Sequence, residues 1–263
     1  MTMRVASIGH AIFAVTLIGL GIMGLITGAF TPVWLPAPRS TPAREILAYA
    51  SALVCLLPGI GLLWRRSAAA AARVLFGTFL AWLLLVDLPA LLLHPGMDLT
   101  WALAKTATLL SAAWVLYVWF GSDGDRRRLG FVAGATGLRV ARSLYGLALM
   151  VFGIAHFTYL ARTTSMVPGW LPWHLAWAYF FGCTFIAAGV AVIIGVYARL
   201  AAVLSVVQLA MFTALVWVPV IVSGPSASDW GEFVVSWALT AAAWVVADSY
   251  RGVPRVPPWE SPS

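Results

Sequence analysis

The ionisable side chains inside long apolar segments are the first candidates for chemistry in this sequence. Asp87 and Lys105 each interrupt such a segment, and His156 lies near the end of another. Ionisable groups are costly to place in a membrane, so they are functional candidates wherever they occur there. A carboxylate and an ammonium at one depth could relay a proton or an ion. These three residues are therefore the candidate functional side chains.

Asp87 and Lys105 are predicted to pair. Asp87 comes shortly before the end of one apolar segment and Lys105 shortly after the start of the next. A tight antiparallel hairpin would bring the two to the same depth. A mutual pair is also favoured because a single buried charge is the expensive state. The pair could be a relay or a purely structural contact, and the sequence leaves both open.

His156 is followed by a predicted external loop that contains Trp170, Pro172 and His174. A histidine near a membrane surface could relay protons or contact a quinone headgroup, or it could only bond a neighbouring helix. The tryptophans have a simpler explanation as an aromatic belt at the membrane interface. The two cysteines, Cys55 and Cys183, give no zinc spacing. No metal site is predicted, and catalytic residues remain unknown.

The composition decides what surrounds these residues. Of the 263 residues, 62% are hydrophobic and only 10% are charged, whereas soluble domains carry about 25% charged residues. The chain therefore needs lipid as its solvent. The net charge of +7 comes from short basic clusters between apolar runs and not from one patch. That pattern orients membrane helices and speaks against nucleic-acid binding.

Eight apolar runs are long enough to cross a bilayer, which takes roughly 20 helical residues. The prediction is an all-α polytopic membrane protein with eight transmembrane helices, because only helices satisfy every backbone hydrogen bond within such a run. The runs are 7–30, 45–64, 70–94, 99–120, 140–161, 173–197, 200–221 and 230–250.

The basic residues predict the orientation. With eight spans, twelve of the 15 arginines fall on one side and three on the other, while Lys105 lies within a span. Positive charge collects on the cytoplasmic side. Both termini are therefore expected in the cytoplasm, with the protein in a bacterial inner membrane. The twelve are Arg4, Arg65, Arg66, Arg73, Arg126, Arg127, Arg128, Arg139, Arg142, Arg199, Arg251 and Arg255.

The two halves of the chain repeat each other. Trp34-Leu35-Pro36 matches Trp170-Leu171-Pro172, Cys55 matches Cys183, and Pro89 matches Pro219. The predicted organisation is a four-helix repeat at 1–120, a cytoplasmic linker at 121–139, a second repeat at 140–250 and a tail at 251–263. Because each half has an even number of spans, the repeats should share one orientation and be related by an axis along the membrane normal.

The second half resembles the DoxX-like family of small four-helix membrane proteins. The resemblance rests on Gly153-Ile154-Ala155-His156-Phe157, on the loop 167–172 that ends in Trp170-Leu171-Pro172, and on Gly182 and Gly189. The family often has an acidic residue in its second helix, where this chain has Phe185. The first half has no histidine equivalent to His156, and Gly24 stands nearest.

The resemblance implies an accessory or anchoring subunit of a membrane redox system, with a quinone contact near His156. The alternatives are a small-molecule or ion permease and a non-catalytic partner of another membrane or redox protein. Few polar residues lie near the middle of the spans, which counts against transport, because transporter sites are usually polar there. Whether the protein is an enzyme is left open, with no catalytic activity of its own favoured.

Overall fold

The computed structural model describes residues 6–37 and 43–251. Within these ranges all regular structure is helical, and eight helical spans are long and apolar enough to cross a membrane. The predicted fold class is confirmed: this is an all-α polytopic membrane protein. The spans are α1 (Ile8–Thr27), α2 (Arg44–Leu62), α3 to α4 (Ala68–Leu93), α5 (Met97–Phe120), α8 (Ala135–Thr158), α10 (His174–Ile194), α11 to α12 (Ala198–Val222) and α13 (Ala227–Asp248).

Shorter helices occupy the connections: a 3-10 turn at Pro32–Trp34, α6 (Asp123–Arg128), α7 (Gly130–Ala133) and α9 (Leu160–Ser165). The segment predicted as a linker at 121–139 is thus partly helical, and α8 begins at Ala135, five residues before the predicted start. Arg73 of α3 (Ala68–Trp82) bonds Asp125 of α6 at 2.8 Å, which ties this connection to the helices.

Two spans are interrupted at matching places. A π-helical segment at Leu83–Asp87 separates α3 from α4 (Leu88–Leu93), and another at Thr213–Trp217 separates α11 (Ala198–Phe212) from α12 (Val218–Val222). Pro89 and Pro219 follow directly. Proline has no N–H to donate, so the helix has to adjust its hydrogen bonds before it.

The helix starts also match between the halves. The first residues of α2 and α10, of α3 and α11, of the two π segments, and of α5 and α13 all lie 130 positions apart. The offset does not extend to the first spans, since α1 and α8 begin 127 residues apart. It therefore relates α3 and α5 of the first half to α11 and α13 of the second, position by position, while the repeat as a whole remains a prediction.

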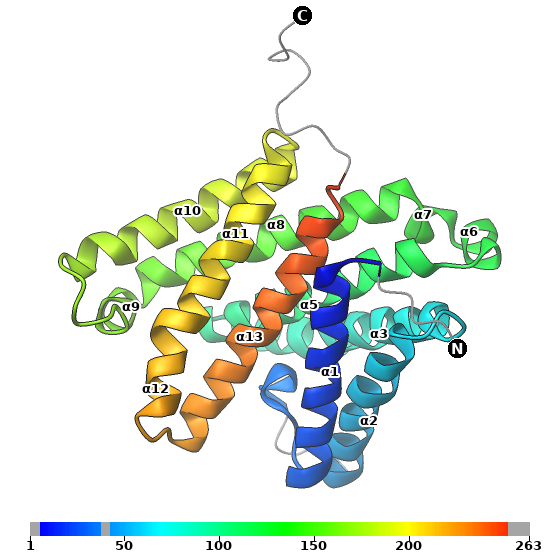
Figure 1. Ribbon diagram of the computed structural model, residues 1–263, viewed down its shortest axis with the longest axis horizontal. Helices are drawn as coiled ribbons and strands as arrows, with labels where there is room; N and C mark the ends of the chain where they lie inside the picture. Colours follow the sequence, from blue (N-terminus) through cyan, green and yellow to red (C-terminus); the bar gives the residue numbers. More distant parts are fainter. Residues whose placement is uncertain (1–5, 38–42, 252–263) are drawn as a thin grey trace, which may run out of the picture.

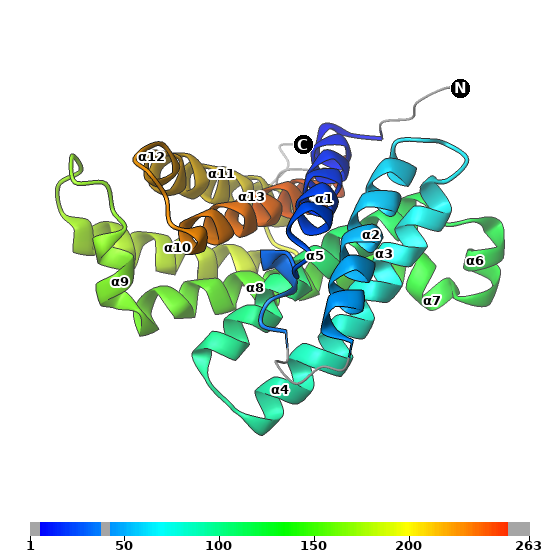
Figure 2. The same ribbon diagram turned by 90° about the horizontal axis from the view of Figure 1, so that it is seen from below.

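Helices of one half pack against helices of the other half as well as against their own neighbours. α1 packs along α2 and also along α13 of the other half, and α8 packs along α10 and along α5. α5 and α13 contact each other at the centre (Figures 1 and 2). At the contact between α1 and α2, a Cβ on Gly21 would lie 2.5 Å from Leu56 Cβ; between α8 and α10, one on Gly153 would lie 2.6 Å from the carbonyl oxygen of Gly182. Only glycine allows such close helix contacts.

The start of α1 and the end of α13 meet on one face of the molecule. The backbone N–H of Gly9, at the start of α1, donates to Asp248 Oδ2, at the end of α13, over 3.0 Å. We call this the terminus face and the opposite one, which carries α9, the loop face. That the terminus face is cytoplasmic remains a prediction from the arginine count.

Candidate functional site

Lys105 of α5 is buried, with 2% of its surface exposed, and it contacts the connection between α1 and α2. Its Nζ donates to the carbonyl oxygen of Pro32 over 3.0 Å and also to that of Leu35. An ammonium removed from water needs such acceptors. Lys105 therefore anchors a loop by its backbone.

The predicted direct pair of Asp87 with Lys105 is not what the structure contains. Asp87 is buried and its Oδ2 has no hydrogen-bond partner among the described residues, with Thr106 and Trp82 beside the carboxyl group. The two charges are close enough to attract each other, but they form no ion pair within 4.0 Å. Lys105 donates to the loop carbonyls instead because the loop folds inward, which no hairpin argument could anticipate.

Trp34 is the side chain that packs this loop into the interior, and it is only 1% exposed. Its indole stacks on Phe79, with ring centroids 5.0 Å apart and an angle of 17°, and meets Trp82 edge-on at 5.1 Å. Aromatic pairs in these geometries are favourable beyond the area they bury. The turn Pro32–Trp34 is thus packed inward against α3, and it also contacts α5 and α13.

The corresponding loop of the second half lies outside. Trp170 is 72% exposed, and Pro172 is exposed as well. Beneath it a cavity of about 290 Å³ lies between α5, α8, α10, α11 and α13. His156 lines this cavity and also a second one of about 160 Å³, to which Trp170 contributes. The predicted residues His156 and Trp170 are therefore brought to one region of the molecule.

His156, on α8, is half-buried and has one ring nitrogen engaged. Nδ1 lies 2.7 Å from the carbonyl oxygen of Phe152. A carbonyl oxygen only accepts, so Nδ1 carries the proton, and in a neutral imidazole Nε2 is then an acceptor. Nε2 is not among the buried side-chain atoms that lack a partner, and the side chain lines both cavities. The ring also packs on Phe185, with centroids 5.4 Å apart.

The two cavities differ in character but share His156, Phe185 and Phe212. The smaller one is almost wholly apolar, with Trp177 and Phe181 in its wall. The larger one has a polar mouth on the loop face. A ligand beside His156 could therefore place an apolar part in one cavity and a polar part toward the other.

Four ionisable side chains form the polar mouth. The Tyr159 hydroxyl donates to Asp98 Oδ1, and Arg162 lies 3.8 Å from Glu232. The Asp98 carboxylate raises the pKa of the Tyr159 hydroxyl because it accepts that proton in a hydrogen bond. These contacts connect the segment around α9 to α5 and α13. They also mean that polar ligands would enter beside two carboxylates and one guanidinium.

The remaining histidine predicted as a candidate lies apart from this site: His174 begins α10. A further histidine, His94, is exposed at the end of α4. Cys55 is buried and Cys183 is exposed, so the two thiols do not occupy equivalent surroundings. Among residues 6–37 and 43–251, no cluster of three or more His, Cys, Asp and Glu side chains could hold a metal ion.

One buried histidine was missed by the sequence analysis. His10 of α1 is fully buried, accepts the N–H of Ala6 at Nδ1 over 3.2 Å, and packs on Phe120 at 5.1 Å. Its position in an apolar run was the available signal. Its surroundings are those of a packed core residue near the terminus face, where its Nε2 is buried and has no hydrogen-bond partner among the described residues.

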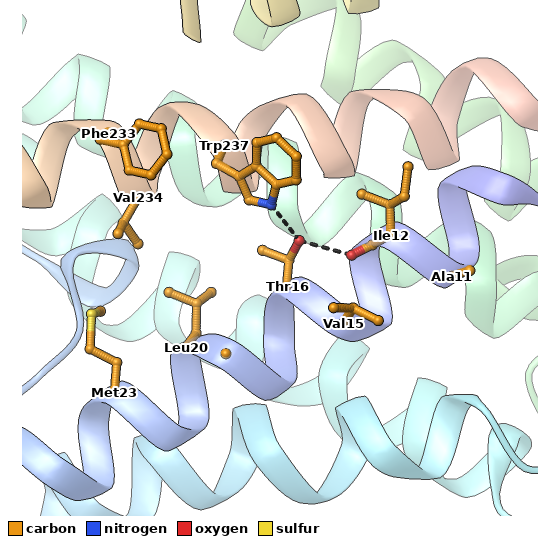
Figure 3. Close-up of a pocket in the computed structure, with 10 residues that line it drawn as sticks. Ala11, Ile12, Val15, Thr16, Leu20, Met23, Phe233, Val234 and Trp237 are labelled. Carbon is orange, nitrogen blue, oxygen red and sulfur yellow. Dashed lines mark hydrogen bonds between the residues drawn. The ribbon is translucent and has the colours of Figure 1, made fainter. Parts of the chain in front are cut away.

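A wider groove of about 430 Å³ runs between α1 and α13 (Figure 3). Trp237 of α13 points across it, and its Nε1 donates to Thr16 Oγ1 of α1 over 3.0 Å. The rest of the lining is apolar or glycine, including Val15 and Leu20. With no ionisable side chain, it is a weaker candidate for chemistry than the cavities at His156.

Comparison with known proteins gives no relative to reason from. No protein-family model, no curated protein and no solved structure matches this chain. A fold alone does not specify a function, so the function has to be argued from the site itself.

Proposed function

We propose that this integral membrane protein is a DoxX-like accessory subunit of a membrane redox system, and that it binds a quinol beside His156. It would lie in a bacterial inner membrane with both termini cytoplasmic. The single observation that carries the proposal is His156, whose Nδ1 is engaged by Phe152, which leaves Nε2 as an acceptor on a side chain that lines two cavities.

The chemistry of the site favours the reduced form of such a ligand. A quinol hydroxyl donates a hydrogen bond, which Nε2 of a neutral His156 can accept. The apolar cavity lined by Trp177 and Phe181 suits a hydrocarbon tail, and the mouth at Asp98 and Arg162 suits the polar end. A quinone has only carbonyl oxygens, which need a donor, so it should bind less well.

The test is binding of duroquinol and duroquinone to the purified protein in detergent. A lost hydrogen bond of about 1.5 kcal/mol corresponds to roughly a tenfold loss of affinity. We expect His156→Ala to weaken duroquinol by about this factor and to change duroquinone less. His94→Ala, at an exposed histidine, is the matched control and should bind normally.

Equal affinities in the wild type and in His156→Ala would contradict the proposal. So would uptake of a small solute or ion by proteoliposomes that depends on Asp87 and Lys105, since that result would indicate a permease. Co-purification of a redox enzyme that is lost when the loop face is altered would extend the proposal to the partner.

A further inference from the structure

The space that is a cavity in the second half is filled in the first half. There the 3-10 turn Pro32–Trp34 enters between the helices, with Trp34 packed against Phe79 and Trp82. Lys105 fixes the turn through the carbonyl groups of Pro32 and Leu35. In the first half, the Trp34 side chain of the protein itself thus fills this space.

The offset of 130 residues places this occupant in the equivalent of the open cavity. Phe79, Trp82 and Lys105 correspond to Leu209, Phe212 and Val235. All three counterparts line the cavity of about 290 Å³, and so do the counterparts of Asp87, Thr106 and Leu109, which are Trp217, Ser236 and Leu239. The walls that hold Trp34 in one half are therefore the walls of the cavity in the other.

Residue differences explain why one space is filled and the other open. Gly24 is the nearest counterpart of His156, and a Cβ there would lie 2.7 Å from Ala52 Cβ of α2 and 3.1 Å from Thr31 Cγ2 of the loop. A larger side chain at this position would therefore collide with both α2 and the loop. Val235 has no donor with which to hold loop carbonyls, as Lys105 does. The second half therefore lacks the anchor that holds the inward loop of the first half, and its space stays open.

We infer that the cavity beside His156 accepts a planar ring, which takes the place that the Trp34 indole occupies in the first half. The inference rests on the proposed function in that both place a ligand beside His156, and it narrows the ligand class. Phe212 presents an aromatic ring to the occupant, as Trp82 does to Trp34, and rings prefer stacked or edge-on partners. His156 Nε2 accepts an O–H or N–H from the edge of that ring. The ligand is thus a flat aromatic or quinol ring with a donor group, and not an aliphatic alcohol or an acyl chain.

Indole is the probe for this inference, because it is the side chain of Trp34 as a free molecule. Native mass spectrometry of the whole protein released from detergent counts the bound molecules. We expect one indole on the wild type and two on Trp34→Ala, where the vacated space in the first half becomes a second site. Trp34→Phe, which keeps a ring in place, should still bind one. Indole should also raise the melting temperature of Trp34→Ala more than that of the wild type.

A second variant decides the matter if Trp34→Ala does not fold. Phe212→Ala removes the ring from the wall of the open cavity and should weaken indole about tenfold while leaving cyclohexanol unchanged. Phe180→Ala, at a side chain that is 53% exposed on α10, is the matched control. Equal losses for indole and cyclohexanol would overturn the inference. A folded Trp34→Ala that still binds only one indole would also overturn it.

The two proposals fail in different ways. If indole binds as expected and duroquinol does not depend on His156, the quinol assignment is wrong and the planar-ring cavity stands. If duroquinol depends on His156 but cyclohexanol competes as well as indole does, the ring specificity is wrong and the quinol assignment stands.

Discussion

The two halves of the molecule share their helices and differ in what lies between them. Their later spans and their π segments begin 130 residues apart, yet Trp34 is 1% exposed and Trp170 is 72% exposed. Both tryptophans stand in the same Trp-Leu-Pro sequence. A shared motif therefore does not guarantee a shared environment. The surrounding residues, here Gly24 and Lys105 against His156 and Val235, decide whether the loop packs inward.

The largest expected effect tests this difference directly. Trp34→Ala should lower the free energy of unfolding by about 4 kcal/mol, because it empties a packed aromatic site. Trp170→Ala should change it by less than about 0.5 kcal/mol, since the side chain is exposed. Unfolding in mixed micelles, followed by circular dichroism, measures both. Equal losses would show that the two loops are packed alike.

Lys105 gives the next effect. Lys105→Met removes two hydrogen bonds from a charged donor and leaves the carbonyl groups of Pro32 and Leu35 without it, so we expect a loss of about 3 kcal/mol. Val235→Met, the matched change in the second half, should cost less than about 1.5 kcal/mol.

The same measurement separates the loop anchor from the predicted ion pair. If Lys105 acts mainly on the loop, adding Asp87→Asn to Lys105→Met should recover only a small part of the loss. A recovery of most of the loss would mean that Asp87 is the principal partner.

A smaller effect should be equal in the two halves. Gly21→Ala and Gly153→Ala each push a methyl group into the neighbouring helix, and each should cost about 2 kcal/mol. Gly19→Ala, where a Cβ meets nothing within 4 Å, should leave stability unchanged or raise it by up to about 1 kcal/mol. A large difference between Gly21→Ala and Gly153→Ala would show that the two halves share the positions of their helix ends but not the packing of their helices.

The smallest effect concerns the connection between the halves. Hydrogen bonds from Arg73 and Ser122 hold the pKa of Asp125 well below its usual range. Because the folded state lowers this pKa, the stabilisation is present at neutral pH and fades as the pH falls below about 4. The melting temperatures of wild type and Asp125→Asn should therefore differ slightly at neutral pH and converge in acid. Since Asp125 and Arg73 lie at the surface, added salt should also reduce the difference.

The sequence was sufficient for the helices because their signal is strong and local. Runs such as 99–120 and 200–221 are apolar for longer than any soluble helix needs, and the structure places α5 and α11 to α12 there. The matching prolines, Pro89 and Pro219, lie two residues after the π segments, which the sequence analysis did not predict. Boundaries were less certain, as the start of α8 at Ala135 demonstrates.

The site was only partly predictable because it depends on how loops fold. His156 was identified as a candidate, but the role of its Nε2 as an acceptor follows from a contact with Phe152 that composition cannot specify. Lys105 was identified with the wrong partner, since depth in a hairpin does not reveal that a distant turn enters between the helices. The polar mouth at Tyr159 and Glu232 joins residues of separate elements and left no local signal.

The packing of α1 on α13 and of α8 on α5 has a consequence for how this chain could have evolved. In each half, the first and the last long helix pack against helices of the other half. A protein made of a single four-helix unit would therefore leave these packing surfaces of its first and last helices uncovered. Two such units could complete each other by pairing around a twofold axis. Gene fusion would then have joined two units that already packed against each other. After the fusion, the loop around Trp34 could fill its space permanently, while the cavity beside His156 stayed open to a ligand.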